Sequence, residues 1–151
     1  MSPPKPRVPP LALAIALSAL AYAVSRYHLM PVPSVSLIVV GLVGLLGGGI
    51  IFTALIQFRR HKTTAHPLNF ANTTVLLASG VFSLSRNPIY LGMLILMLSL
   101  ALACADLLSF VPGIIFWLWI NYWQIAAEEN HLQRHFGAAY VEYCKQVRRW
   151  L

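Results

Sequence analysis

Apolar and polar positions follow one another along this chain in long blocks rather than with a short period. Four blocks are almost entirely apolar and cover residues 11–27, 35–58, 89–105 and 107–127. As helices rising 1.5 Å per residue, they would cross most or all of the ~30 Å hydrocarbon core of a bilayer. Prolines precede three of the blocks, at positions where a helix begins or is broken. The pattern therefore predicts four membrane-spanning helices.

The segment after residue 127 has a different pattern. Apolar side chains recur there at helical spacing, opposite a basic face. The apolar set is Phe136, Tyr140, Tyr143 and Val147, and the basic set is Lys145, Arg148 and Arg149. Such a stripe is typical of a helix that lies along the membrane surface. We therefore predict an all-α integral membrane protein with about four transmembrane helices plus a C-terminal interfacial amphipathic helix.

The overall composition agrees with a membrane protein. Hydrophobic residues make up 58% of the chain and charged residues 10%, and the mean hydropathy is +0.70, values that lie far from those of soluble domains. A chain of 151 residues has room for one domain. We expect a single membrane domain, 1–151, in which residues 1–58 form two spans. Residues 59–151 would then hold a cofactor-binding loop, two further spans and the C-terminal helix.

The distribution of basic residues predicts the topology. Of the eleven Lys and Arg residues, ten fall in the N-terminal segment, the 59–87 segment or the C-terminal region, the exception being Arg26. Four spans would place these regions on one side, which the positive-inside rule makes cytoplasmic. We therefore expect a multi-pass protein with cytoplasmic N- and C-termini. The net charge of +7 does not indicate nucleic acid, because the basic residues flank apolar segments instead of forming a patch interleaved with aromatics.

Polar side chains follow one face of the last predicted span as it leaves the membrane. They recur every three or four residues, at Asn121, Gln124, Glu128, His131 and His135. A polar stripe on a membrane helix usually faces protein or a cavity. The deeper members, Asn121 and Gln124, favour a cavity over a helix that simply emerges into solvent. Glu128 and Glu129 point in different directions on a helix, so one carboxylate can face a ligand while its neighbour pairs with a basic residue of the loop.

A second motif opens the third predicted span, where Arg86-Asn87-Pro88-Ile89-Tyr90-Leu91-Gly92 begins an apolar block. Pro88 suits the first turn of a helix, whose free N–H groups can bind an anion such as a cofactor carboxylate. Tyr90 can stack or donate a hydrogen bond, and Gly92 allows close approach of a ligand or of another helix. By itself the motif is also compatible with an ordinary helix start that carries a snorkelling arginine.

Metal chemistry is disfavoured. His131 and His135 have a spacing that suits zinc, but a site also needs a third ligand and a second shell, and no matching cluster is present in the sequence. The two cysteines, Cys104 and Cys144, have the spacing of neither a disulfide framework nor a metal site. We therefore expect no metal.

Taken together, R-N-P-x-Y-x-G and E-E-x-x-L-x-x-x-F-G-x-x-Y-x-x-Y-x-x-x-V-x-R-W resemble the C-terminal half of the isoprenylcysteine carboxyl methyltransferase family and its phospholipid methyltransferase relatives. The resemblance covers roughly residues 59–151 and includes a loop similar to that of bacterial members. It implies a bacterial inner-membrane enzyme that binds S-adenosylmethionine at the cytoplasmic face. The methyl acceptor would be a lipophilic small molecule or a lipid reached from the bilayer.

Residue by residue, the resemblance assigns nine positions to the cofactor pocket: Arg86, Asn87, Pro88, Tyr90, Gly92, Glu128, Glu129, Leu132 and Tyr140. For catalysis the candidates are Glu128, His131 and Gln124. A carboxylate acceptor needs no general base, whereas an amine or hydroxyl does. The acceptor stays open, because the charged residues that eukaryotic prenylcysteine enzymes carry just before the paired glutamates are replaced here by Gln124-Ile125-Ala126-Ala127.

Two rival functions remain. Sterol reductases resemble this family in their C-terminal half and bind NADPH in a similar place, so an NADPH-dependent membrane reductase is the first alternative. This chain of 151 residues lacks their additional helices. The second alternative is a non-enzymatic membrane protein that retains the fold.

Overall fold

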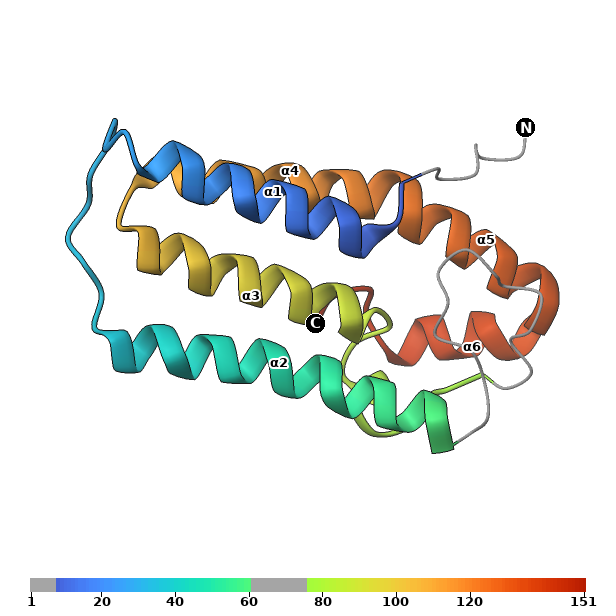
Figure 1. The fold of residues 1–151 in the computed structure, drawn as a ribbon. Coiled ribbons are helices and arrows are strands. Elements are labelled where there is room, and N and C mark those ends of the chain that lie inside the picture. The colour runs from blue at the N-terminus through green and yellow to red at the C-terminus, as the bar shows by residue number, and fades with distance from the viewer. Residues whose placement is uncertain (1–7, 61–75) are drawn as a thin grey trace.

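The computed structural model describes residues 8–60 and 76–151, and the regular elements in this part of the chain are all helical (Figure 1). Helix α1 covers Pro10–Ser25, α2 covers Leu37–Arg60 and α3 covers Pro88–Cys104, each within about two residues of the predicted block. Prolines stand in the first turn of α1 and α3, where the missing N–H group has no intrahelical partner to lose. A short 3₁₀ turn, Gly80–Ser83, precedes α3.

The helix that contains the fourth apolar block continues past residue 127, as the polar stripe through His135 predicted. A 3₁₀ turn at Leu107–Phe110, α4 at Val111–Trp119, a π-helical turn at Ile120–Gln124 and α5 at Ile125–Phe136 form one helical stretch. Single π-helical turns are rare, and those that occur are frequently located at functional sites. The turn matters here because it contains the fully buried side chain of Gln124.

The long helices lie side by side as a bundle in which α3 packs against both α1 and α2, and α1 also packs against α4 (Figure 1). By length and composition, Leu37–Arg60 and Leu107–Phe136 can cross a membrane. α1 and α3 are apolar but have 16 and 17 residues, which gives each roughly 24–26 Å at 1.5 Å per residue. The all-helical class is thus confirmed, and the count of four spans stays a prediction.

Glycines allow α2 and α3 to approach each other closely. A Cβ atom placed on Gly92 of α3 would lie 2.5 Å from Cγ1 of Ile51 and 2.7 Å from the carbonyl oxygen of Gly47, both on α2. Small residues at such a crossing let two backbones pack without side chains between them. Gly92, which the motif placed in the cofactor pocket, therefore serves the contact between two helices.

At the end of the bundle away from α5 and α6, one buried carboxylate links the segment between α1 and α2 to the turn between α3 and α4. Asp106 is fully buried, and its two oxygens accept the backbone N–H groups of Leu108 and Met30 at 2.9 and 3.0 Å. It thereby caps the turn into α4 and holds the segment between α1 and α2 against it. α3 ends just before Asp106, at Cys104, within one residue of the end of the apolar block.

The predicted amphipathic helix is present as α6, Ala138–Gln146, but its apolar face packs on protein. Gly137, with φ of +52°, separates α6 from α5 and lets the chain turn back. The buried residues Tyr140, Tyr143 and Val147 form a cluster with Leu76, Leu132 and Phe136. The helix also ends before Arg149, so this residue is not on the outward basic face where the helical spacing placed it.

Candidate active site

A cavity of about 640 Å³ lies among the helices and reaches α5 and α6. Its walls come from α1, α2, α3, α5, α6 and the segment that precedes α3, and most of the lining is apolar. Polar groups gather where α3 begins and α5 passes. They are Arg86, Asn87, Tyr90, Glu128, Glu129 and Tyr140. A cavity that is largely apolar with a few convergent polar groups is the usual form of a small-molecule site.

Glu128 joins the two sequence motifs. Its Oε1 accepts a hydrogen bond from the Tyr90 hydroxyl on α3 and another, at 2.6 Å, from Nε2 of Gln124 one turn earlier. Tyr90 and Gln124 are both buried, so the carboxylate is held by two donors that have little freedom to move. This arrangement presents one carboxylate group to the cavity in a fixed position.

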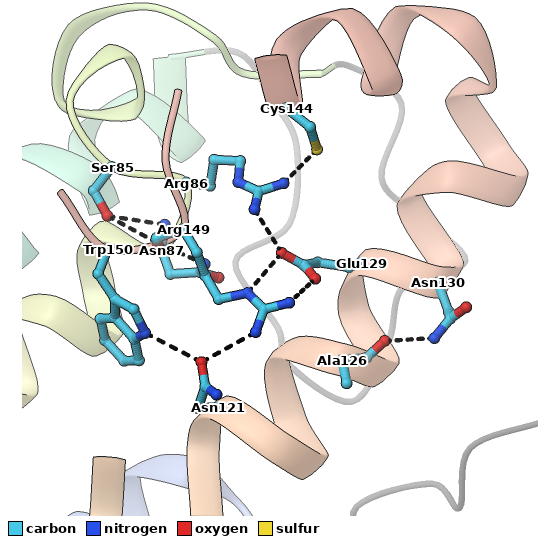
Figure 2. Close-up of polar contacts among 10 residues, drawn as sticks. All are labelled: Ser85, Arg86, Asn87, Asn121, Ala126, Glu129, Asn130, Cys144, Arg149 and Trp150. Atoms are coloured by element: carbon cyan, nitrogen blue, oxygen red, sulfur yellow. Dashed lines mark hydrogen bonds and ion pairs between the residues drawn. The ribbon is translucent and has the colours of Figure 1, made fainter. Parts of the chain in front are cut away.

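Glu129 lies between two arginines (Figure 2). Its Oε1 is 3.1 Å from Nη2 of Arg86 and accepts a hydrogen bond of 3.1 Å from Nε of Arg149, while Oε2 pairs with Nη2 of Arg149. The fork of Arg149 therefore binds the carboxylate through two parallel contacts, the strongest common geometry for this pair. As expected, one of the two glutamates pairs with a basic residue of the segment before α3, Arg86, but Glu129 lines the cavity as well as Glu128.

The start of α3 is held by backbone groups from the far end of the chain. The Asn87 side chain donates to the carbonyl of Arg149 at 3.0 Å, and the Arg86 N–H donates to the carbonyl of Arg148 at 3.1 Å. The hydroxyl of Ser85 in turn accepts the Asn87 N–H at 3.1 Å. Asn87 and Pro88 also line the cavity. These hydrogen bonds therefore fix the position of the first turn of α3 at the site.

Two tyrosines of α6 close the polar end and stay protonated. Burial raises the pKa of Tyr140, and the negative charge of Glu129 raises it further. Burial also raises the pKa of Tyr143 to about 12, although the nearby Arg86 acts in the opposite direction. The Tyr143 hydroxyl donates to the carbonyl of Phe82 at 2.6 Å, which ties α6 to the 3₁₀ turn before α3.

Most of the residues proposed from the sequence meet at this cavity. Eight of the nine cofactor positions line it: Arg86, Asn87, Pro88, Tyr90, Glu128, Glu129, Leu132 and Tyr140. Gly92 does not, because it faces α2. Of the catalytic candidates, Gln124 reaches the cavity through Glu128, whereas His131 is not among the lining residues and stacks on His135 with ring centroids 6.2 Å apart. In the described residues no three His, Cys, Asp or Glu side chains form a metal-binding group.

Sequence reasoning missed the role of residues 149 and 150. Arg149 was placed on a solvated face, yet its guanidinium lies against Glu129 and Asn121. Trp150 donates its indole N–H to Asn121 at 3.2 Å and packs against the apolar core. Two signals were available: the second motif ends in V-x-R-W, which includes both residues, and the large apolar surface of a tryptophan tends to be buried.

A bundle of apolar helices whose largely apolar cavity carries charged groups at one end is typical of a membrane-associated protein with a small-molecule site. Residues 35–139, more than half of the chain, match the phospholipid methyltransferase family, and the chain belongs to that family. The family indicates a methyltransferase associated with membranes. An uncharacterized protein of Haemophilus influenzae is 44% identical over 62 residues, which cover 41% of this chain and 98% of that protein. No solved structure matches the chain significantly.

Proposed function

We propose that this protein is an S-adenosylmethionine-dependent methyltransferase that acts on a lipophilic, isoprenoid- or lipid-like acceptor at the cytoplasmic membrane face. The family supports methyl transfer. The observation that carries the proposal is the hydrogen bond between Tyr90 and Glu128, because it brings both sequence motifs into the wall of one cavity. The reductase alternative has no comparable support from the family.

The polar end of the cavity fits a cofactor that carries both positive and negative groups. Glu128 offers a carboxylate for hydroxyl or cationic groups. Arg86 offers a buried Nε–H that has no acceptor among the described residues, and such an orphaned donor is costly unless a partner completes it. The residues that would hold the cofactor are Arg86, Asn87, Pro88, Tyr90, Glu128, Glu129, Leu132 and Tyr140.

When bound, S-adenosylmethionine would supply an electrophilic methyl group, whose carbon a lone pair of the acceptor attacks in line while the bond to the sulfonium sulfur breaks and S-adenosylhomocysteine leaves. The chain has to align the two reactants and exclude water. Glu128 is placed to take the proton of an amine or hydroxyl acceptor, with Tyr90 and Gln124 orienting it. Because His131 is not among the lining residues, the role of general base falls to Glu128, and a carboxylate acceptor would not need it.

The apolar part of the cavity suits the hydrophobic body of the acceptor. It is bounded by Leu11 and Ile15 of α1, by Ile51 and Leu55 of α2, and by α3 between them. α1 and α2 both pack on α3, so an apolar chain lying along α3 would pass between them toward the polar end. The acceptor proposed is therefore one with a single polar head on an apolar body.

The orientation proposed is a multi-pass inner-membrane protein with this end in the cytoplasm. α2 ends with Arg59 and Arg60 at the end of the bundle where α6 lies, and Arg148 and Arg149 follow α6, whereas Arg26 follows α1 at the opposite end (Figure 1). The positive-inside rule places the richer end in the cytoplasm. Nucleotide-derived cofactors are found on that side.

Titration of the detergent-solubilised protein separates the alternatives. We expect S-adenosylmethionine and its demethylated product, S-adenosylhomocysteine, to bind in preference to NADPH in calorimetry. Tight binding of NADPH without a response to S-adenosylmethionine would establish the reductase alternative. Binding of none of the three ligands by folded, monodisperse protein would favour a non-enzymatic role.

A further inference from the structure

Residues 147–150 follow α6 without helical structure, and their contacts lie beside the polar end of the cavity. Val147 already has extended backbone angles, with φ of −124° and ψ of 130°. From there the segment contacts three separate elements: the start of α3, the π-helical turn at Asn121, and α5 at Glu129. Figure 2 shows these contacts together. We call residues 147–150 the return segment.

The return segment is anchored at its far end by Trp150. The indole N–H donates to Oδ1 of Asn121, and the same oxygen accepts Nη1 of Arg149 at 3.1 Å. The ring packs against the core cluster that contains Tyr90, Phe116 and Ile120. An aromatic side chain with its polar group satisfied contributes strongly to such an anchor. The backbone of the segment is thus fixed beside the motif that opens α3.

Arg149 is the residue through which the segment reaches the site. Its guanidinium divides its donors between Glu129 and Asn121, while its own carbonyl accepts the side chain of Asn87. The side chain of Arg149 is 34% exposed, against 20% for Glu129. The arginine therefore covers the carboxylate from the outer side. It does not line the cavity, so its effect on a ligand passes through Glu129 and Asn87, which do.

We propose that the return segment is a positioning element of the methyl-transfer site, in which Arg149 sets the orientation of Glu129 and the start of α3. The identity of the ligand rests on the proposed function, whereas the contacts of Arg149 do not depend on any ligand. With Arg149 in place, both oxygens of Glu129 are engaged and only one arrangement of the carboxylate satisfies them. Without it, Glu129 keeps its contact with Arg86 and gains freedom to turn.

The test compares Arg149→Gln, Arg149→Lys and the matched control Arg134→Gln, whose arginine is exposed on α5. We expect Arg149→Gln to weaken S-adenosylhomocysteine binding roughly tenfold, the scale of one lost charge-assisted hydrogen bond. Arg149→Lys keeps the charge but cannot bind the carboxylate through two parallel hydrogen bonds, so its affinity for S-adenosylhomocysteine should lie between those of Arg149→Gln and the parent. Arg134→Gln should bind like the parent. Adding Glu129→Gln to Arg149→Gln should cost less than the two single effects combined, because both changes remove the same contact.

A second readout needs no cofactor. The amide of Arg86 donates to the carbonyl of Arg148, so loosening the return segment should speed hydrogen exchange in a peptide covering residues 84–90 of the ligand-free protein. Faster exchange confined to this peptide in Arg149→Gln, at an unchanged melting temperature and absent from Arg134→Gln, supports the positioning role. If the parent binds no S-adenosylhomocysteine, that result contradicts only the proposed function. Parent-like exchange and affinity in Arg149→Gln overturn the inference. A lower melting temperature with unchanged affinity also overturns it, since that result describes a structural contact alone.

Discussion

The contact between α2 and α3 and the polar end of the cavity are held together in opposite ways. α2 and α3 meet through Gly47 and Gly92, where a single added methyl group would overlap atoms of the other helix. One hydrogen bond there, from the Ser99 hydroxyl to the carbonyl of Val40 at 2.8 Å, also links the pair. The polar end depends on a network of directional contacts centred on Glu128 and Glu129.

The difference shows how one short motif serves two purposes. In Arg86-Asn87-Pro88-Ile89-Tyr90-Leu91-Gly92, the side chains of Arg86, Asn87 and Tyr90 turn toward the polar end. Gly92 turns toward α2. The same stretch of α3 thus supplies ligand-facing groups and a point of close helix packing. Changes in the first region should alter binding, and changes in the second should alter stability.

The largest effect should come from Gly92→Ala. The new methyl group would meet Ile51 and the backbone of Gly47 at distances that require the helices to separate, and overpacking of this kind costs roughly 1–3 kcal/mol or more. We expect a clear fall in melting temperature in detergent. Gly48→Ala is the matched control, because a Cβ atom there has no neighbour within 4 Å. Alanine is also the better helix former, so this control should be neutral or stabilising by up to about 1 kcal/mol. Equal melting temperatures for both variants would contradict the role of Gly92 in the close packing of α2 and α3.

Glu128→Gln should leave stability nearly unchanged and reduce affinity for S-adenosylmethionine. The substitution keeps the shape of the side chain but removes its charge. The loss of a charge-assisted hydrogen bond typically costs ~1.5–3 kcal/mol, roughly tenfold to a hundredfold in affinity. Glu142→Gln is the control, since Glu142 is exposed and pairs with Lys145 at 3.0 Å on the outer side of α6. Parent-like affinity in the folded Glu128 variant would contradict the placement of the cofactor.

The sequence predicted the helices well because long apolar blocks leave few alternatives. Proline positions set the starts of α1 and α3, and Asp106 marked the end of α3, where it accepts two backbone N–H groups. The last helix extends beyond the fourth apolar block to Phe136, as the polar stripe from Asn121 to His135 implied, because a helix does not have to end where its side chains become polar.

The positions of the site residues were predictable only where they shared a face of one element. Glu128 and Gln124 stand four residues apart and meet as expected. The return segment could not be foreseen in this way, because extrapolating the helical period through Val147 placed Arg149 in solvent. The helix ends before that residue, and the interactions that turn it inward come from Glu129 and Asn121, elements distant in sequence. A local period carries no information about such partners.

The smallest effect concerns the tie between α6 and the turn before α3, and it depends on pH. The pKa of Tyr143 is about 12 in the folded protein, against about 10 in an unfolded chain. Between these values the unfolded chain has released a proton that the native state retains, so the free energy of unfolding falls as pH rises; below about pH 10 the contribution is fully present.

Tyr143→Phe removes this dependence and also leaves the Phe82 carbonyl without its donor, at a cost of about 1 kcal/mol near neutral pH. We therefore expect the variant to melt lower than the parent at neutral pH, and this difference in melting temperature to shrink and then reverse between about pH 10 and pH 12. Tyr140, whose pKa is raised as well, remains in both proteins and cancels in the comparison. If the difference in melting temperature between the two proteins stays constant over this pH range, the Tyr143 hydroxyl does not retain its proton in the folded state, contrary to what its burial implies.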